Sequence, residues 1–123
     1  MQSNPVNWFE IYVQDMGRAK DFYESVFQLK LEKLITSDLE IWAFPMMKDR
    51  FGASGALVKM NGLPSGGNST LVYFHCADCS VEAARVVKFG GRIQREKMSI
   101  GQYGFIALAY DTEGNMFGLH SMQ

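Results

Sequence analysis

Side chains that can do chemistry stand in short stretches that alternate between polar and apolar residues. Glu10 lies two residues from Trp8 and from Tyr12, so all three share one face of a strand predicted over residues 8–13. His120 ends another such stretch near the C-terminus. A carboxylate and an imidazole can orient a ligand, or accept and return a proton. We therefore take Glu10 and His120 as the candidate catalytic residues.

The same alternation places aromatic and polar residues on further strands. Aromatic walls with a few convergent polar groups are typical of small-molecule sites. The same residues would also fit a plain hydrophobic core in which the polar tips of Trp and Tyr have found partners. We expect a ligand site, and its predicted ligand-binding residues are Trp8, Tyr12, Trp42, Phe44, Tyr73 and His75.

Two cysteines form a Cys-x-x-Cys motif where a predicted strand passes into a predicted helix. A thiolate at a helix N-terminus is electrostatically favoured, which is how redox motifs lower the pKa of a thiol. Asp78 lies between Cys76 and Cys79 and disfavours a thiolate. Cys76 is also expected on the helix side of its strand. We therefore interpret it as a small core residue rather than a redox group.

The elements that must position these side chains occur twice along the chain. Asp15 and Asp78 are 63 residues apart (78 − 15), and each follows a predicted strand and precedes a predicted helix. Asp15 is expected to cap the first helix, and Asp78 or Ser80 the second. Shorter strands follow in each half, so the predicted unit is βαβββ, twice. The apolar stripe expected to pack the first helix on its sheet is Ala19, Phe22, Tyr23 and Val26.

One domain, residues 1–123, is predicted to contain both copies. A stretch rich in Gly, Pro and Ser, residues 61–68, is the expected linker. It separates a first module of about residues 5–60 from a second module of about residues 69–121. The remaining strands are predicted over residues 30–36, 39–46, 53–60, 70–76, 92–98, 103–110 and 116–120.

Composition narrows the classes of function. The chain is 47% hydrophobic and 13% aromatic, which is enough to build a core. Its net charge is −1 and its charges are scattered, whereas nucleic-acid binding needs clustered Lys and Arg. No apolar run approaches the roughly 18 residues of a membrane span, and residues 1–5 lack an apolar signal segment. We expect a cytoplasmic protein that binds neither nucleic acid nor membrane.

Three segments carry a resemblance to a known family: residues 13–23 with Phe27, Gly90-Gly91 before a strand, and residues 111–119. They resemble the vicinal oxygen chelate superfamily, which includes glyoxalase I, bleomycin- and fosfomycin-resistance proteins and extradiol dioxygenases. The resemblance implies an α+β fold in which two βαβββ modules form curved mixed sheets around a cavity. It also implies a homodimer, because related proteins commonly complete their sheets by two-fold pairing.

Metal-dependent members of this superfamily place ligands on the first and last strands of each module, where a divalent cation presents open positions to substrate oxygens. By the resemblance, three of these positions correspond to Trp8, Leu71 and Gly118, and the fourth falls within residues 55–58. None of these residues has a side chain that can bind a metal. We therefore expect no metal and no other cofactor.

Three hypotheses of function follow. The leading one is a glyoxalase-like protein that binds a small organic molecule by stacking on Trp8 and Trp42. The second is a metal-dependent lyase or isomerase acting on small carbonyl compounds or thiol adducts. It requires a shifted metal site built from Glu10, His75 and His120. The third is an interaction or accessory protein without a small ligand, whose cavity its own side chains fill.

Overall fold

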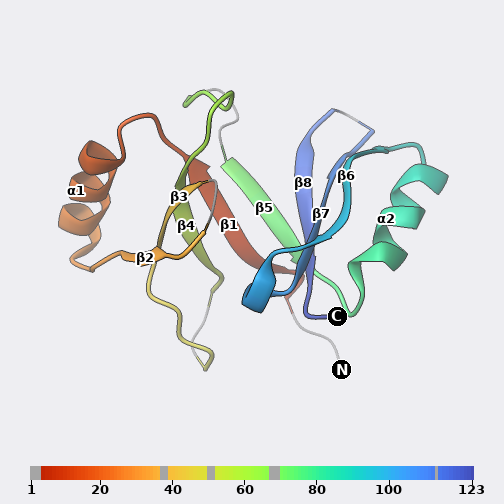
Figure 1. Ribbon diagram of the computed structural model, residues 1–123, viewed down its shortest axis with the longest axis horizontal. Coiled ribbons are helices and arrows are strands. Elements are labelled where there is room, and N and C mark those ends of the chain that lie inside the picture. Colours follow the sequence, from red (N-terminus) through yellow and green to blue (C-terminus); the bar gives the residue numbers. More distant parts are fainter. Residues whose placement is uncertain (1–3, 37–38, 50–51, 67–69, 113) are drawn as a thin grey trace. The chain divides into compact units, whose positions relative to one another are not determined.

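The computed structural model describes residues 4–36, 39–49, 52–66, 70–112 and 114–123. Along the chain, a strand, a helix and three further strands follow one another twice (Figure 1). The prediction of an α+β fold with a repeated βαβββ unit is therefore confirmed. The chain divides into two compact units, an N-terminal unit, Trp8–Leu71, and a C-terminal unit, Val72–Gln123 with the residues up to Asn7. Neither helix is long and apolar enough to cross a membrane in the described part of the chain.

The N-terminal unit is a four-stranded mixed sheet with one helix. Its strands lie in the order β2-β3-β4-β1, with β1 parallel to β4 and the other neighbours antiparallel. The hairpin predicted from residues 30–46 is present, although its expected turn at residues 37 and 38 lies outside the described residues. The elements are β1 (Val6–Tyr12), α1 (Met16–Phe27), β2 (Glu32–Leu34), β3 (Glu40–Ala43) and β4 (Ser54–Lys59).

Helix α1 begins where the sequence predicts and packs through only part of the predicted stripe. Asp15 is its N-cap, and the carboxylate accepts a hydrogen bond from the backbone N–H of Arg18 at 3.0 Å. Met16 is buried, and Ala19 and Tyr23 pack beside it against the sheet. The expectation that Phe22 and Val26 share this contact is wrong, because their side chains are 58% and 54% exposed.

The C-terminal unit repeats this plan. Its strands lie in the order β5-β8-β7-β6, with β5 parallel to β8 and the other neighbours antiparallel. Helix α2 packs chiefly across β6 and β7 (Figure 1). The elements are β5 (Thr70–His75), α2 (Cys79–Lys88), β6 (Arg92–Ser99), a short 3₁₀ turn (Gly101–Tyr103), β7 (Phe105–Tyr110) and β8 (Met116–Ser121).

Asp78, rather than Ser80, caps helix α2. Its carboxylate accepts hydrogen bonds from the backbone N–H of Ser80 at 3.0 Å and from Lys97 Nζ at 2.9 Å. The bond from Lys97, followed by those from Ser80, lowers the pKa of Asp78 to about 2. The helix ends just before Gly90, whose φ of +101° is a conformation that favours glycine. The end that the Gly90-Gly91 pair predicts is confirmed.

The segments at the ends of the two units are held by hydrogen bonds. The carbonyl of Pro5 accepts a hydrogen bond from the His75 N–H at 2.8 Å within the C-terminal unit. The expected linker is fastened to the N-terminal unit. Gln14 Nε2 donates to the Leu63 carbonyl at 2.9 Å, and Ser65 Oγ donates to the carbonyl of residue 12 at 3.0 Å. Residues 67 and 68 of this stretch lie outside the described residues.

Candidate functional site

Three predicted site residues come together on one face of β1. Trp8 Nε1 donates a hydrogen bond to Glu10 Oε2 at 3.2 Å, and the Tyr12 hydroxyl donates to Glu10 Oε1 at 2.7 Å. On the other face of the strand, Ile11 and Val13 pack into the core beneath α1. The predicted division of this strand into two faces is confirmed. Alternation alone was the signal that placed the carboxylate between its two aromatic donors.

The strands beside β1 present small side chains next to Glu10. Glu10 lies opposite Ala56 in the parallel pair, and Ala56 lies opposite Ala43 in the next pair. Both alanines are fully buried. The carboxylate is part-buried and is held by a hydrogen bond to each of its oxygens. Such a group is an oriented acceptor for an N–H or O–H donor, and it lies at the N–H edge of an indole.

Trp42 and Phe44 lie on the opposite side of the same sheet. Trp42 is opposite Leu57 in the β3–β4 pair, and its ring packs with the core beneath α1. Lys20 of α1 places its ammonium 3.4 Å from the centre of the Trp42 ring. Phe44 meets the ring of Tyr23 edge-on at 5.8 Å. The expectation that these two aromatics share a wall with Glu10 is therefore corrected, because helix α1 covers the face they occupy.

The remaining predicted residues belong to the C-terminal unit. Tyr73 lies opposite Gly118, and His75 lies opposite His120, in the parallel pair β5–β8. His75 is exposed, and its Nδ1 is 3.4 Å from Asn7 Nδ2. The structure thus brings His75 and His120 to neighbouring positions within one unit.

His120 presents a buried nitrogen. Its Nε2 is 2.7 Å from the Tyr103 carbonyl, and since a carbonyl only accepts, we assign the proton to Nε2. Nδ1 is then an acceptor. It is buried and has no hydrogen-bond partner within the described residues. This nitrogen can accept a hydrogen bond or a proton from a molecule that reaches it.

The positions at which the resemblance implies metal ligands do not fit a metal. Gly118 has no side chain, and a Cβ built there would overlap Cδ1 and Cε1 of the Tyr73 ring. Leu71 is buried and apolar, and Trp8 donates its only polar hydrogen to Glu10. Within the described residues of either unit, no three His, Cys, Asp or Glu side chains form a group that could hold a metal ion. We therefore derive no chemistry through a resident metal.

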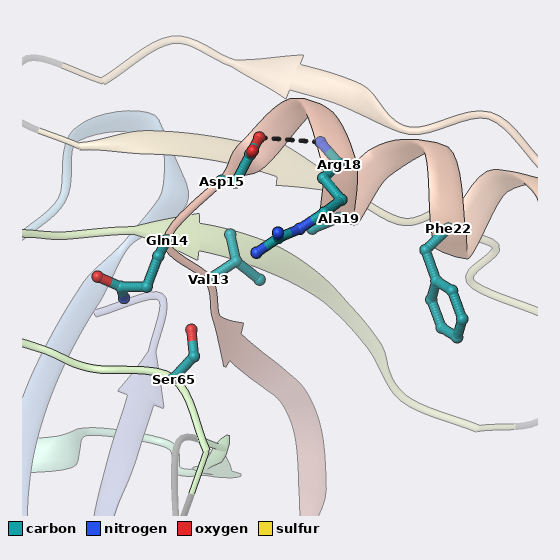
Figure 2. A pocket seen from close by; sticks show the side chains of 7 residues that line it. All are labelled: Val13, Gln14, Asp15, Arg18, Ala19, Phe22 and Ser65. Carbon is teal, nitrogen blue, oxygen red and sulfur yellow. Dashed lines mark hydrogen bonds between the residues drawn. The ribbon is translucent and has the colours of Figure 1, made fainter.

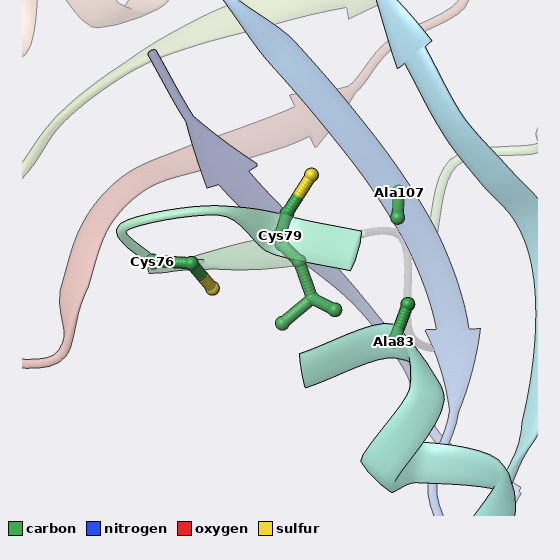
Figure 3. Close-up of a cluster of buried hydrophobic side chains, with 5 residues drawn as sticks. Cys76, Cys79, Ala83 and Ala107 are labelled. Carbon is green, nitrogen blue, oxygen red and sulfur yellow. The ribbon is translucent and has the colours of Figure 1, made fainter. Parts of the chain in front are cut away.

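The Cys-x-x-Cys motif is part of the core of the C-terminal unit. Cys76 and Cys79 are free thiols, 4% and 0% exposed, and pack with Ala83 and Ala107 (Figure 3). Burial raises the pKa of the Cys76 thiol to about 12, and the nearby charge of Glu82 adds to the rise. A thiol with this pKa is protonated and unreactive at neutral pH. These observations support the structural interpretation of Cys76.

We expect neither cysteine of the folded protein to react with a disulfide reagent such as DTNB near neutral pH, and both to react after unfolding in guanidinium. The Cys76 pKa is higher in the folded chain than its ordinary value of 9.0. Its contribution to stability is therefore fully present below pH 9.0 and is lost as the pH rises toward about 12. Urea unfolding across this range measures the loss, and Cys76→Ala should flatten it. Rapid labelling of one thiol in the folded protein would contradict the assignment.

A cavity that the sequence interpretation missed lies where β1 leads into α1 (Figure 2). Its volume is about 300 Å³. Most of its polar groups already make hydrogen bonds within the chain. Asp15 caps α1, and the Gln14 and Ser65 side chains hydrogen-bond backbone carbonyls, which ties the segment after β4 to the end of β1. The sequence carries one signal for this place. Asp15 precedes a predicted helix, and the side chain of a capping Asp commonly accepts a hydrogen bond from the backbone N–H of the third residue after it. The lining residues are Val13, Gln14, Asp15, Arg18, Ala19, Phe22 and Ser65.

Solved structures with the same fold cover nearly the whole chain. Methylmalonyl-CoA epimerase from Mycobacterium tuberculosis matches with a TM-score of 0.73 and 14% identity, over 100% of this chain and 93% of that one. A hypothetical protein from Bacillus halodurans matches with a TM-score of 0.75 and 12% identity, over 99% and 96%. Methylmalonyl-CoA epimerase from Streptomyces coelicolor, in complex with 2-nitronate-propionyl-CoA, matches with a TM-score of 0.69 and 15% identity, over 96% of both chains.

A sequence search of curated proteins finds no significant match. The model of one protein family, in contrast, matches residues 6–119, which is nearly the whole chain. That span includes both βαβββ units except for the last two residues of β8. The chain therefore belongs to the Glyoxalase/Bleomycin resistance protein/Dioxygenase superfamily.

Proposed function

We propose that this protein binds a small organic molecule at the face of β1 that carries Trp8, Glu10 and Tyr12. The observation that carries the proposal is the carboxylate of Glu10, held between an indole N–H and a phenol hydroxyl. The ligand class that fits is an aromatic or carbonyl compound that also carries an N–H or O–H donor. Its flat part would stack on Trp8, and its donor would bind Glu10.

The chemistry of the face supports this proposal over a plain core. Part-buried carboxylates are rare in hydrophobic cores because removing the charge from water is costly. Two aromatic donors offset part of that cost and fix the direction of the group. A carboxylate fixed in this way is suited to positioning a donor on a ligand, or to accepting a proton from it. We separately propose that the buried Nδ1 of His120, which belongs to the C-terminal unit, accepts a hydrogen bond or a proton from a ligand bound to that unit.

The proposal does not require a metal. The positions that metal-dependent members use carry Trp8, Leu71 and Gly118, and the ring of Tyr73 fills the space of a side chain at Gly118. A metal-dependent lyase or isomerase is therefore not the function we propose. Two of the similar structures are methylmalonyl-CoA epimerases, one in complex with 2-nitronate-propionyl-CoA and one with methylmalonyl-CoA. We include methylmalonyl-CoA among the compounds to be tested for that reason.

Binding is tested by NMR titration with a panel of aromatic alcohols, hydroxyketones, aromatic amides and methylmalonyl-CoA. We expect at least one compound to shift the amide signals of β1 in a saturable way. Glu10→Gln keeps the shape of the side chain and removes its charge, so it should weaken binding by about tenfold, as for loss of a charge-assisted hydrogen bond. Glu96→Gln is the matched control, because Glu96 is an exposed carboxylate on β6. Equal affinity in wild type and Glu10→Gln would contradict the proposal.

We also expect a homodimer. Exposed apolar side chains gather on α1, where Phe22, Val26 and Phe27 are more than half exposed. A second copy of the chain would bury them, and isologous pairing is the commonest way for a small domain to do so. Light scattering during size-exclusion chromatography should give twice the 13.9 kDa mass of the chain. A monomer mass at micromolar concentration would contradict the expectation.

The two free thiols fit a reducing compartment, so we propose a cytoplasmic location.

A further inference from the structure

A second concave surface lies on the α2 side of the C-terminal unit. It is a groove of about 630 Å³ between α2 and the strands β5 and β8. Small-molecule sites commonly have volumes of about 300–1,000 Å³. Val72, Phe74 and Phe117 form its apolar floor, and Glu82 and Arg85 face it from α2. None of these residues belongs to the β1 face proposed above.

The groove exists because α2 does not cover the whole sheet. The helix packs chiefly across β6 and β7, with Ala83 buried against the core. The surface of β5 beside it is left uncovered, and Val72 is 37% exposed there. Phe74 and Phe117 meet edge-on at 5.7 Å and are only partly buried. An apolar molecule that lay against these side chains would remove them from water.

Glu82 adds a carboxylate whose hydrogen bonds are only partly made. Its side chain hydrogen-bonds the Cys76 thiol, so it lies near the apolar floor of the groove. Its Oε1 is buried and has no hydrogen-bond partner among the described residues. A buried carboxylate oxygen without a donor is costly. A ligand that supplies a donor at this place would remove that cost.

We propose that this groove binds a small organic amine, with its apolar body against β5 and β8 and its ammonium hydrogen-bonded to Glu82. Two carboxylates, Glu82 and Asp111, line the groove together with one guanidinium, that of Arg85. The balance of charge favours a cation over an anion. An ammonium also carries three donors, so it can satisfy Oε1 and keep contact with water.

The probe is 2-phenylethylamine, titrated into ¹⁵N-labelled full-length protein and followed by amide chemical shifts. We expect saturable shifts at Val72, Phe74 and Glu82. The alcohol 2-phenylethanol has the same apolar body without the charge, and it should bind about tenfold more weakly. Glu82→Gln should weaken binding of the amine by a similar factor. Glu96→Gln, which removes an exposed carboxylate from the same unit, should leave the affinity unchanged.

One further variant and the position of the shifts keep the result decisive. Val72→Ser shortens the apolar floor at a partly exposed position, so it should weaken binding while the spectrum stays that of a folded protein. Saturable shifts confined to residues of β1 would place the amine on the β1 face and would overturn the proposal. Equal affinity in wild type and Glu82→Gln would overturn the proposal. The absence of saturable shifts would also overturn it.

Discussion

Replacing Gly118 by alanine is expected to destabilise the protein by about 1–3 kcal/mol, the usual cost of overpacking a core. A Cβ at this position would overlap the Tyr73 ring, and it would lie 2.8 Å from the ring's Cγ. The ring cannot move away easily, because Tyr73 is only 5% exposed. Urea unfolding of the wild type and of Gly118→Ala measures the difference in the free energy of unfolding.

A double-mutant cycle shows whether the Tyr73 ring is the cause. In a Tyr73→Ala background the added methyl group meets empty space, so Gly118→Ala should cost much less there than in the wild type. Gly17→Ala is the matched control, because the nearest atom to its Cβ is 3.7 Å away and Gly17 lies in the first turn of α1. That control should be neutral or slightly stabilising. The same cost in both Tyr73 backgrounds would contradict the account of this position.

Truncating Leu57 to alanine is expected to cost about 2–5 kcal/mol, the range found for buried leucines. Leu57 is completely buried and lies between Ile11 of β1 and Trp42 of β3 in the sheet. The helix α1 covers this face, so a cavity left there cannot fill with water. Such a loss is a large part of the about 5–15 kcal/mol that stabilises a typical domain.

The control for Leu57→Ala is Ile35→Ala, which removes an apolar side chain that is 90% exposed. It should change the free energy of unfolding by no more than about 0.5 kcal/mol. Both variants are compared with the wild type by urea unfolding. Where the slope of the unfolding free energy against urea concentration is unchanged, a shift of the midpoint reports a change in stability. A small effect of Leu57→Ala would show that the core beneath α1 is loosely packed, contrary to the structure.

The sequence predicts this fold well where the signal is local. Alternation over residues 8–13 identified both faces of β1, because side chains in a strand point to opposite sides at every step. Asp15 and Asp78 marked the starts of both helices, because a carboxylate one residue before a helix accepts its orphan N–H groups. The repeat of these signals after 63 residues was sufficient to predict two βαβββ units.

The sequence fails where the answer depends on how distant strands align. Trp42 belongs to a strand of four residues, and only its pairing with Leu57 shows that it faces α1. The contact of Tyr73 with Gly118 likewise follows from the register of β5 and β8, 45 residues apart in sequence (118 − 73). Helical spacing predicts Phe22 in the core stripe of α1, yet Phe22 is 58% exposed, and Met16 packs against the sheet beside Ala19 and Tyr23. Helical spacing alone does not determine which side of an apolar arc meets the sheet.

The central claim is that a small molecule binds on the Glu10 face of β1, and the two tryptophans of the chain test it most directly. Trp8 lies on that face, and Trp42 lies on the face covered by α1. Two single-tryptophan proteins, Trp42→Phe and Trp8→Phe, are titrated with the tightest-binding compound of the panel while tryptophan fluorescence is recorded. The account predicts a saturable change in Trp42→Phe, where Trp8 is the only reporter, and little change in Trp8→Phe. A response carried by Trp42 alone, or no binding by any compound, would contradict it.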